Sequence, residues 1–134
     1  MRDHLTASAL LIAVAHLLAF ESLAWFAPAL GPDQICKAAI AAIMGRASSI
    51  IRIDRADGEV RFLSYVRADG TKWAYRCKLD GTRVIWAGAE GRWRIAPEDE
   101  RIEFAAPGDG SSVTITQRFT DGSVSTKSFK RSGL

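Results

Sequence analysis

Histidine is almost absent from this sequence of 134 residues. The chain contains only His4 and His16, and no imidazole follows them. If the first 29 residues are removed, the protein lacks the side chain on which Ser-His and Cys-His nucleophile systems and histidine-ligated metal sites depend. We therefore expect a protein that is not an enzyme, with no metal site and no cofactor.

Cysteine is equally scarce, with Cys36 and Cys77 as the only two thiols. They stand 41 positions apart, which fits neither a C-x-x-C redox pair nor a zinc knuckle. In an oxidising compartment this pair predicts one disulfide, which would stabilise the fold by about 4 kcal/mol in the chain-entropy model. The alternative is a pair of buried thiols that never meet.

Only one long hydrophobic run is present, at the N-terminus. The segment 5–20 carries no formal charge, Arg2 precedes it, and small-residue patterns end at Ala24 and Ala29. This layout is typical of a secretory signal peptide, which we place at residues 1–29. An uncleaved membrane anchor is the main alternative, and a buried helix is the third. The two leading interpretations place the rest of the chain outside the cytoplasm, as a periplasmic, secreted or anchored protein.

Residues 30–134 suit one globular domain, because single domains commonly contain about 100 to 150 residues. The chain is 48% hydrophobic and 25% charged, which disfavours wholesale disorder. Without residues 1–29, 17 basic side chains face 13 acidic ones, a formal balance of +4. This mild excess favours anionic partners but falls short of the dense basic tracts of nucleic-acid-binding proteins.

The period of the hydrophobic pattern changes once along the domain. Helical spacing over residues 33–44 predicts a helix with Asp33 as N-cap and Gly45 as stop signal. Alternation over residues 50–131, broken by repeated Asp-Gly steps, predicts an antiparallel meander of about eight strands, with "GRWRI" (residues 91–95) as the fifth. The expected fold is α+β and predominantly β, either a curved sheet or a small barrel.

In the third expected strand, Trp73, Tyr75 and Cys77 alternate with Arg76 and Lys78. A bridge from Cys77 to the helix would therefore cross the core, and the other rows would face outward. Those rows would form a basic sheet face, and charged strand faces of this kind usually only keep a sheet soluble and unaggregated. The alternative, on which the functional hypothesis depends, is that the face binds an anionic glycan, a lipid headgroup or an acidic protein patch. The candidate binding residues are Arg61, Leu63, Tyr65, Arg67, Lys72, Arg76, Lys78, Arg92 and Arg94.

The segment "PEDER" places Glu98, Asp99 and Glu100 side by side before a strand. Paired carboxylates can perform glycoside chemistry, but only from facing walls. We expect a solvated turn here. No P-loop, dinucleotide-binding glycine motif or calcium loop is present in the sequence.

The strand "WAYRCKL" resembles the cysteine-bearing aromatic strand of lysozyme-inhibitor barrels, whose further motifs are not found here. No residue role is carried over from that resemblance. The sequence predicts a small exported binding, inhibitor or accessory module with an unknown anionic or protein partner in the cell envelope. An OB-like nucleic-acid-binding barrel is the alternative function, and a carboxylate-dependent hydrolase the lesser one.

Overall fold

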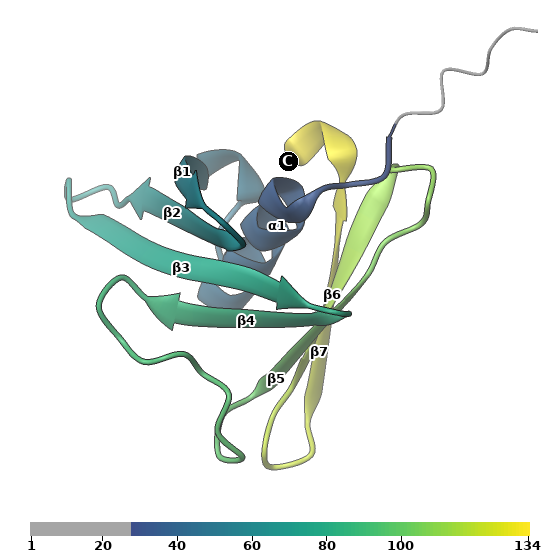
Figure 1. The fold of residues 1–134 in the computed structure, drawn as a ribbon. Coiled ribbons are helices and arrows are strands. Elements are labelled where there is room, and N and C mark those ends of the chain that lie inside the picture. The colour runs from purple at the N-terminus through teal and green to yellow at the C-terminus, as the bar shows by residue number, and fades with distance from the viewer. Residues whose placement is uncertain (1–27) are drawn as a thin grey trace, which may run out of the picture.

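A computed structural model describes residues 28–134 of the chain. The expected leader at residues 1–29 lies outside them, apart from its last two positions. A single helix, α1, packs against a strongly bent antiparallel sheet (Figure 1). Within residues 28–134, no helix has both the length and the hydropathy needed to cross a bilayer.

Helix α1 spans Pro32–Met44 and confirms the helix predicted for residues 33–44. The expected N-cap was wrong by two positions, because Gly31 caps the helix and Asp33 lies in its first turn. A proline occupies the first helical position, where its missing N–H costs nothing. The Gly31 N–H instead donates to Gln34 Oε1 at 3.0 Å. Gly45 ends the helix in the left-handed region, at φ 62°.

Seven strands follow in a meander, and each pairs antiparallel with the next along the chain. The sheet is not closed into a barrel, so β1 and β7 remain edges. Alternating and β-branched residues favour these strands, and a turn separates each from the next. The strands are β1 (Arg52–Asp57), β2 (Val60–Val66), β3 (Lys72–Asp80), β4 (Arg83–Gly88), β5 (Arg101–Ala105), β6 (Ser112–Arg118) and β7 (Val124–Lys130).

The fifth expected strand, residues 91–95, is wrong, because this segment belongs to the long connection 89–100 between β4 and β5, which leaves seven strands. One ladder-like hydrogen bond remains there, from the Arg94 N–H to the Trp86 carbonyl oxygen at 2.9 Å. A tight turn, in which the Gly91 N–H donates to the oxygen of Gly88 at 3.2 Å, bends the chain first. Pro97 then lacks the N–H that a continuing ladder would need.

The Asp-Gly steps do form turns, but not the type I′ turns that Asp-Gly favours in two-residue hairpins. Gly58 and Gly81 have φ values of 56° and 58°, whereas every non-glycine residue described has negative φ. A single positive φ at the first central position matches a type II′ turn. At Gly70 and Gly122 the loops are longer, and each closes with a glycine in the left-handed region.

The core lies between α1 and the sheet, where α1 contacts β3 and β6 most extensively. Ile40 of α1 is fully buried, as are Leu63 of β2 and Ile115 of β6. Cys36 of α1 and Cys77 of β3 are also fully buried and form a disulfide, with 5.8 Å between their Cα atoms. The predicted covalent link from helix to sheet across the core is confirmed.

The ends of the described chain are held together by a short 3₁₀ helix, η2 (Arg131–Gly133). Arg131 Nη1 donates to the carbonyl oxygens of Pro28 at 2.6 Å and of Gly110 at 3.1 Å. Ser48, in the 3₁₀ helix η1 (Ser48–Ile50) after α1, donates to the Gly133 oxygen at 2.6 Å. These contacts fix the start of α1 against the end of the sheet.

Candidate functional site

The strand register divides the predicted binding residues between two faces of the sheet. Directly opposite pairs share a face, and Arg61 and Leu63 lie opposite Cys77 and Tyr75 respectively. Arg61, Leu63 and Tyr65 therefore belong to the face that packs on α1, which we call the inner face. Leu63 and Tyr65 are buried, so the expectation that they lie on an outward face was wrong. The charged residues near the ends of β2 suggested that this row of side chains faces outward, but the burial of its central residues shows that the row faces α1.

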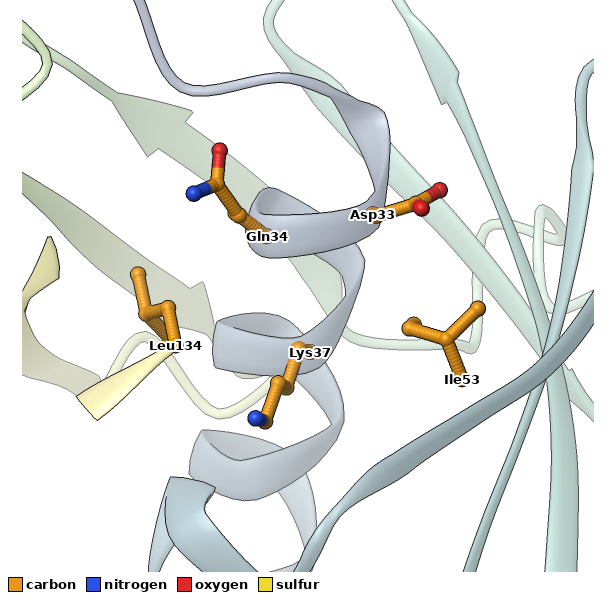
Figure 2. Close-up of a pocket in the computed structure, with 5 residues that line it drawn as sticks. All are labelled: Asp33, Gln34, Lys37, Ile53 and Leu134. Atoms are coloured by element: carbon orange, nitrogen blue, oxygen red, sulfur yellow. The ribbon is translucent and has the colours of Figure 1, made fainter. Parts of the chain in front are cut away.

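Arg61 is engaged at the N-terminus of α1. Its guanidinium forms an ion pair with Asp33 and donates to the Gly58 oxygen at 2.8 Å. Beside this pair lies an open groove of about 260 Å³, with Leu134 and Ile53 of β1 on opposite sides of the helix (Figure 2). Its polar side chains, Asp33, Gln34 and Lys37, point in different directions rather than toward one point.

Arg61 is already paired with Asp33, and the described residues that line the groove offer no convergent polar groups. We therefore do not assign a binding site here.

On the outer face, opposite α1, basic residues hold the 89–100 connection. Arg76 Nε donates to the Gly88 oxygen at 3.2 Å, and Arg76 Nη2 donates to the oxygen of Gly91. The Arg76 guanidinium and the Lys78 ammonium lie 4.7 and 4.4 Å from the centre of the Trp93 ring. These two basic side chains stack on the connection and are thus already committed to the fold.

Arg92 and Lys72 are also paired with carboxylates. Arg92 makes a two-pronged bond to Asp99, at 2.6 and 2.8 Å, while Lys72 lies 3.8 Å from Asp54. Asp99 Oδ2 also accepts from the Ala96 N–H at 3.0 Å. These hydrogen bonds, led by those from Arg92, lower the pKa of Asp99 to about 2. Asp99 therefore closes the turn that also contains Glu98 and Glu100, and its carboxylate is taken up by the ion pair with Arg92.

A row of aromatic rings crosses the inner face from β2 to β4. The rings of Tyr65 and Tyr75 stack with their centres 6.1 Å apart and their planes 14° apart. Tyr75 in turn meets Trp86 of β4, again at 6.1 Å and with the planes tilted by 57°. Trp73 lies directly across the ladder from Tyr65. Alternation along β3 predicted that Trp73 and Tyr75 share the face of Cys77, but the row itself depends on the register of three strands.

Three arginines from three different connections lie over this row. Arg46 follows α1, and its guanidinium carbon lies 5.4 Å from the centre of the Tyr65 ring. Arg67 follows β2 and Arg94 follows β4, at 5.3 Å from Trp73 and 4.8 Å from Trp86 respectively. We name the set the arginine–aromatic cluster; it comprises Arg46, Arg67, Arg94, Tyr65, Trp73, Tyr75 and Trp86.

These arginines differ from Arg61, Lys72 and Arg92, each of which is paired with a carboxylate. Among residues 28–134, no carboxylate lies within ion-pair distance of Arg46, Arg67 or Arg94. A guanidinium that stacks on a ring keeps its in-plane N–H donors for an oxyanion. The cluster therefore combines positive charge with guanidinium hydrogen-bond donors. The sequence predicted Tyr65, Arg67 and Arg94 as binding residues, but on the outer face. It did not predict Arg46, Trp73, Tyr75 or Trp86 as part of a site.

The electrostatics of the row follow from burial and from these arginines. Burial is the main cause that raises the pKa of Tyr75, and the nearby Tyr65 hydroxyl raises it further. The positive charges of Arg46 and Arg67 oppose the shift, which places both within electrostatic reach of the Tyr75 oxygen. The Tyr75 hydroxyl therefore stays protonated at neutral pH and remains a hydrogen-bond donor.

Two buried donors of the cluster lack an acceptor. Trp86 is only 8% exposed, and neither its Nε1–H nor Arg94 Nε–H has a hydrogen-bond partner in the described part of the chain. Buried donors are normally paired, and a third unpaired one in the described residues is Arg83 Nε, also on β4. Because these nitrogen atoms are shielded from solvent, they are not open donors for a ligand.

Between residues 28 and 134, no three His, Cys, Asp or Glu side chains converge in a way that could hold a metal ion. Comparison with protein-family models, with curated proteins and with solved structures finds no match to this chain. The assignment of a site therefore depends on the geometry of the cluster.

Proposed function

We propose that this protein is a small exported, non-enzymatic binding module that captures an anionic partner at the arginine–aromatic cluster. The observation that carries the proposal is the presence of three guanidinium groups over one aromatic row with no carboxylate partner among residues 28–134. Arginine is the side chain best suited to oxyanions, because its planar fork matches carboxylate and phosphate geometry.

The choice of this cluster over the outer face follows from how the basic side chains are used. Arg76, Lys78 and Arg92 secure the 89–100 connection through ring stacking, backbone carbonyls and Asp99. A ligand on the outer face would have to compete with those contacts. The arginines of the inner cluster also stack on rings, but among residues 28–134 they have no ion-pair partner that a ligand would have to displace.

Export is the second part of the proposal. Residues 1–29 would act as a signal peptide or an N-terminal anchor, and the protein would work in the periplasm, outside the cell or at the membrane surface. The disulfide supports this placement, because such bonds persist in oxidising compartments and are rare in the cytosol. The intact mass of protein recovered from its native host would report both leader removal and the two-dalton deficit of the disulfide.

The alternative function, nucleic-acid binding on an OB-like barrel, has less support. An OB fold is a five-stranded Greek-key barrel, whereas this sheet is an open meander of seven strands in sequential order. The third function, a carboxylate-dependent hydrolase, would need a second acid facing Asp99 across a cleft, whereas Asp99 is bonded to Arg92.

The binding proposal is tested by exchanging the three arginines together. We expect the triple variant Arg46→Gln/Arg67→Gln/Arg94→Gln to lose at least about tenfold in affinity for anionic probes, because charge-assisted hydrogen bonds contribute roughly 1.5 to 3 kcal/mol each. The probes are inorganic pyrophosphate, hexaglutamate and polygalacturonate, each titrated by tryptophan fluorescence at two salt concentrations.

A matched control removes the same charge from the outer face, through Arg52→Gln/Arg55→Gln/Lys130→Gln. All three control residues are exposed, and their ladder partners place them opposite α1. The control should bind as the native protein does. If the folded cluster variant binds all three probes as tightly as the control variant, the proposed site is wrong.

A further inference from the structure

We propose that the ligand of the arginine–aromatic cluster is a linear acidic glycan, a chain of sugars that carries carboxylate groups along its length. This inference depends on the proposed function and adds the class of the ligand. It comes from three features of the cluster: one exposed but ordered indole, three buried rings and a row of separated arginines.

Trp73 is the exposed indole. Its residue surface is 45% accessible, yet its position is held by neighbours. The Nε1–H lies 3.4 Å from Thr71 Oγ1, and the Arg67 guanidinium lies over the ring. Thr71 is fixed in turn by Asp69, which accepts from its N–H at 3.0 Å and from its hydroxyl at 2.6 Å. An indole that is ordered before binding offers an apolar platform at low entropic cost, and the C–H face of a pyranose ring fits such a platform.

The other three rings argue against a nucleic acid. Proteins that bind single strands without sequence preference stack successive bases on several exposed aromatic faces. Here Tyr65, Tyr75 and Trp86 are buried, and only Trp73 remains open to a partner. The cluster therefore offers one stacking surface and several guanidinium donors. A glycan that carries many oxygen acceptors matches this arrangement better than a nucleic acid, in which each base needs a stacking surface.

The spacing of the arginines favours a polymer over a single small anion. Arg46 lies over Tyr65 and Arg94 lies over Trp86, with Tyr75 between them, and the rings are 6.1 Å apart at each step. The two guanidinium groups thus lie over rings that are two such steps apart, a spacing that suits several linked carboxylates better than one. Carboxylates on a chain of sugars reach the arginines in turn.

The test is a chain-length series with oligomers of galacturonic acid, from the monomer to the octamer, against neutral oligomers of the same lengths. We expect affinity for the acidic series to rise at least tenfold between monomer and octamer and then to level off, and the neutral series not to bind. Trp73→Ala should weaken octamer binding about tenfold. Phe119→Ala is the control, because Phe119 is also an exposed aromatic, at 40%, but lies beyond the end of β6.

The outcomes separate this inference from the proposed function. The glycan assignment is overturned if octamer and monomer bind equally, or if oligothymidylate or phosphatidylglycerol vesicles bind more tightly than the octamer. If the triple arginine variant then loses binding to whichever anion binds best, the anion site of the proposed function is still supported. If the triple variant binds every anion as the native protein does, the proposed function itself fails. Binding of the octamer that depends on both Trp73 and the arginines supports the two together.

Discussion

Reduction of the Cys36–Cys77 disulfide should cost this domain a large part of its stability. The bond closes a loop with a sequence separation of 41 and joins α1 to β3, two elements that are distant along the chain. In the chain-entropy model, opening a loop of this size returns about 4 kcal/mol of conformational freedom to the unfolded state. A domain of this length is typically stable by only about 5 to 15 kcal/mol.

The perturbation is the double variant Cys36→Ala/Cys77→Ala, compared with the native protein with and without reductant. The free energy of unfolding in urea should fall by about 4 kcal/mol, and the melting temperature by roughly 15 to 30 °C. The far-ultraviolet circular dichroism should stay native under folding conditions, because the other core contacts between α1 and the sheet remain. The dependence on urea should steepen, since an uncrosslinked unfolded chain exposes more surface.

This reasoning is refuted if the variant unfolds within about 1 kcal/mol of the oxidised protein with an unchanged urea dependence. Such a result would mean that the unfolded chain keeps α1 and β3 together without the bond. The single variant Ile40→Ala is a useful comparison, because it removes core contacts of α1 while the disulfide remains. It should lower stability by about 2 to 5 kcal/mol without changing the urea dependence.

Three further predictions concern parts of the fold outside the core. Gly110→Ala should destabilise the protein by more than about 2 kcal/mol in urea unfolding, because Gly110 has φ 69° and an added Cβ would collide with the Pro28 carbonyl that precedes α1. Gly122 also has a positive φ, of 88°, but lies in open space, so Gly122→Ala should cost only the backbone strain of about 1 kcal/mol. Hydrogen bonds from Arg92 lower the pKa of Asp99 to about 2, so the ion pair stabilises the fold fully above the ordinary carboxyl pKa of 3.8 and this stabilisation is lost as the pH falls through 2. The difference in unfolding free energy between the native protein and Asp99→Asn should therefore shrink between pH 5 and pH 2. A difference that stays constant over this range would contradict the ion pair. Arg76→Met should accelerate proteolysis within the connection between β4 and β5 at unchanged global stability, because it removes the hydrogen bonds to that segment, and an unchanged cleavage rate would show that they do not hold it.

The elements that could be predicted from the sequence are those specified by local signals. The helical stripe with Gly45 after it gave α1 to within one residue, and the Asp-Gly steps located the turns. The disulfide could also be predicted, because Cys36 and Cys77 each belong to an apolar face. The connection 89–100 could not, because its alternating "GRWRI" segment imitates a strand. The turn at Gly91 and the packing of Trp93 against Arg76 and Lys78, which make it a connection, are visible only in the structure.

The candidate site was only partly predictable for a related reason. Which face a strand presents depends on its register with its neighbours, and a shift of one residue exchanges all its side chains. The basic residues Arg61 in β2 and Arg67 just after it suggested an outward row, but the burial of Leu63 and Tyr65 places that row inside. Arg46 carried no signal at all, because it follows a helix and reaches Tyr65 only through the tertiary fold.

The position of the disulfide ties the proposed site to the proposed compartment. Cys77 lies directly opposite Trp86 in the ladder and two residues from Tyr75 on the same face. The covalent bond to α1 therefore anchors the strand that carries the centre of the aromatic row, and α1 ends next to Arg46, which stacks on Tyr65. Without the bond, α1 could shift against β3, and Arg46 would shift with it while Arg94 stayed with β4. Ligand affinity should thus fall on reduction even at temperatures where the reduced protein remains folded, which is the behaviour of a site organised for an oxidising environment.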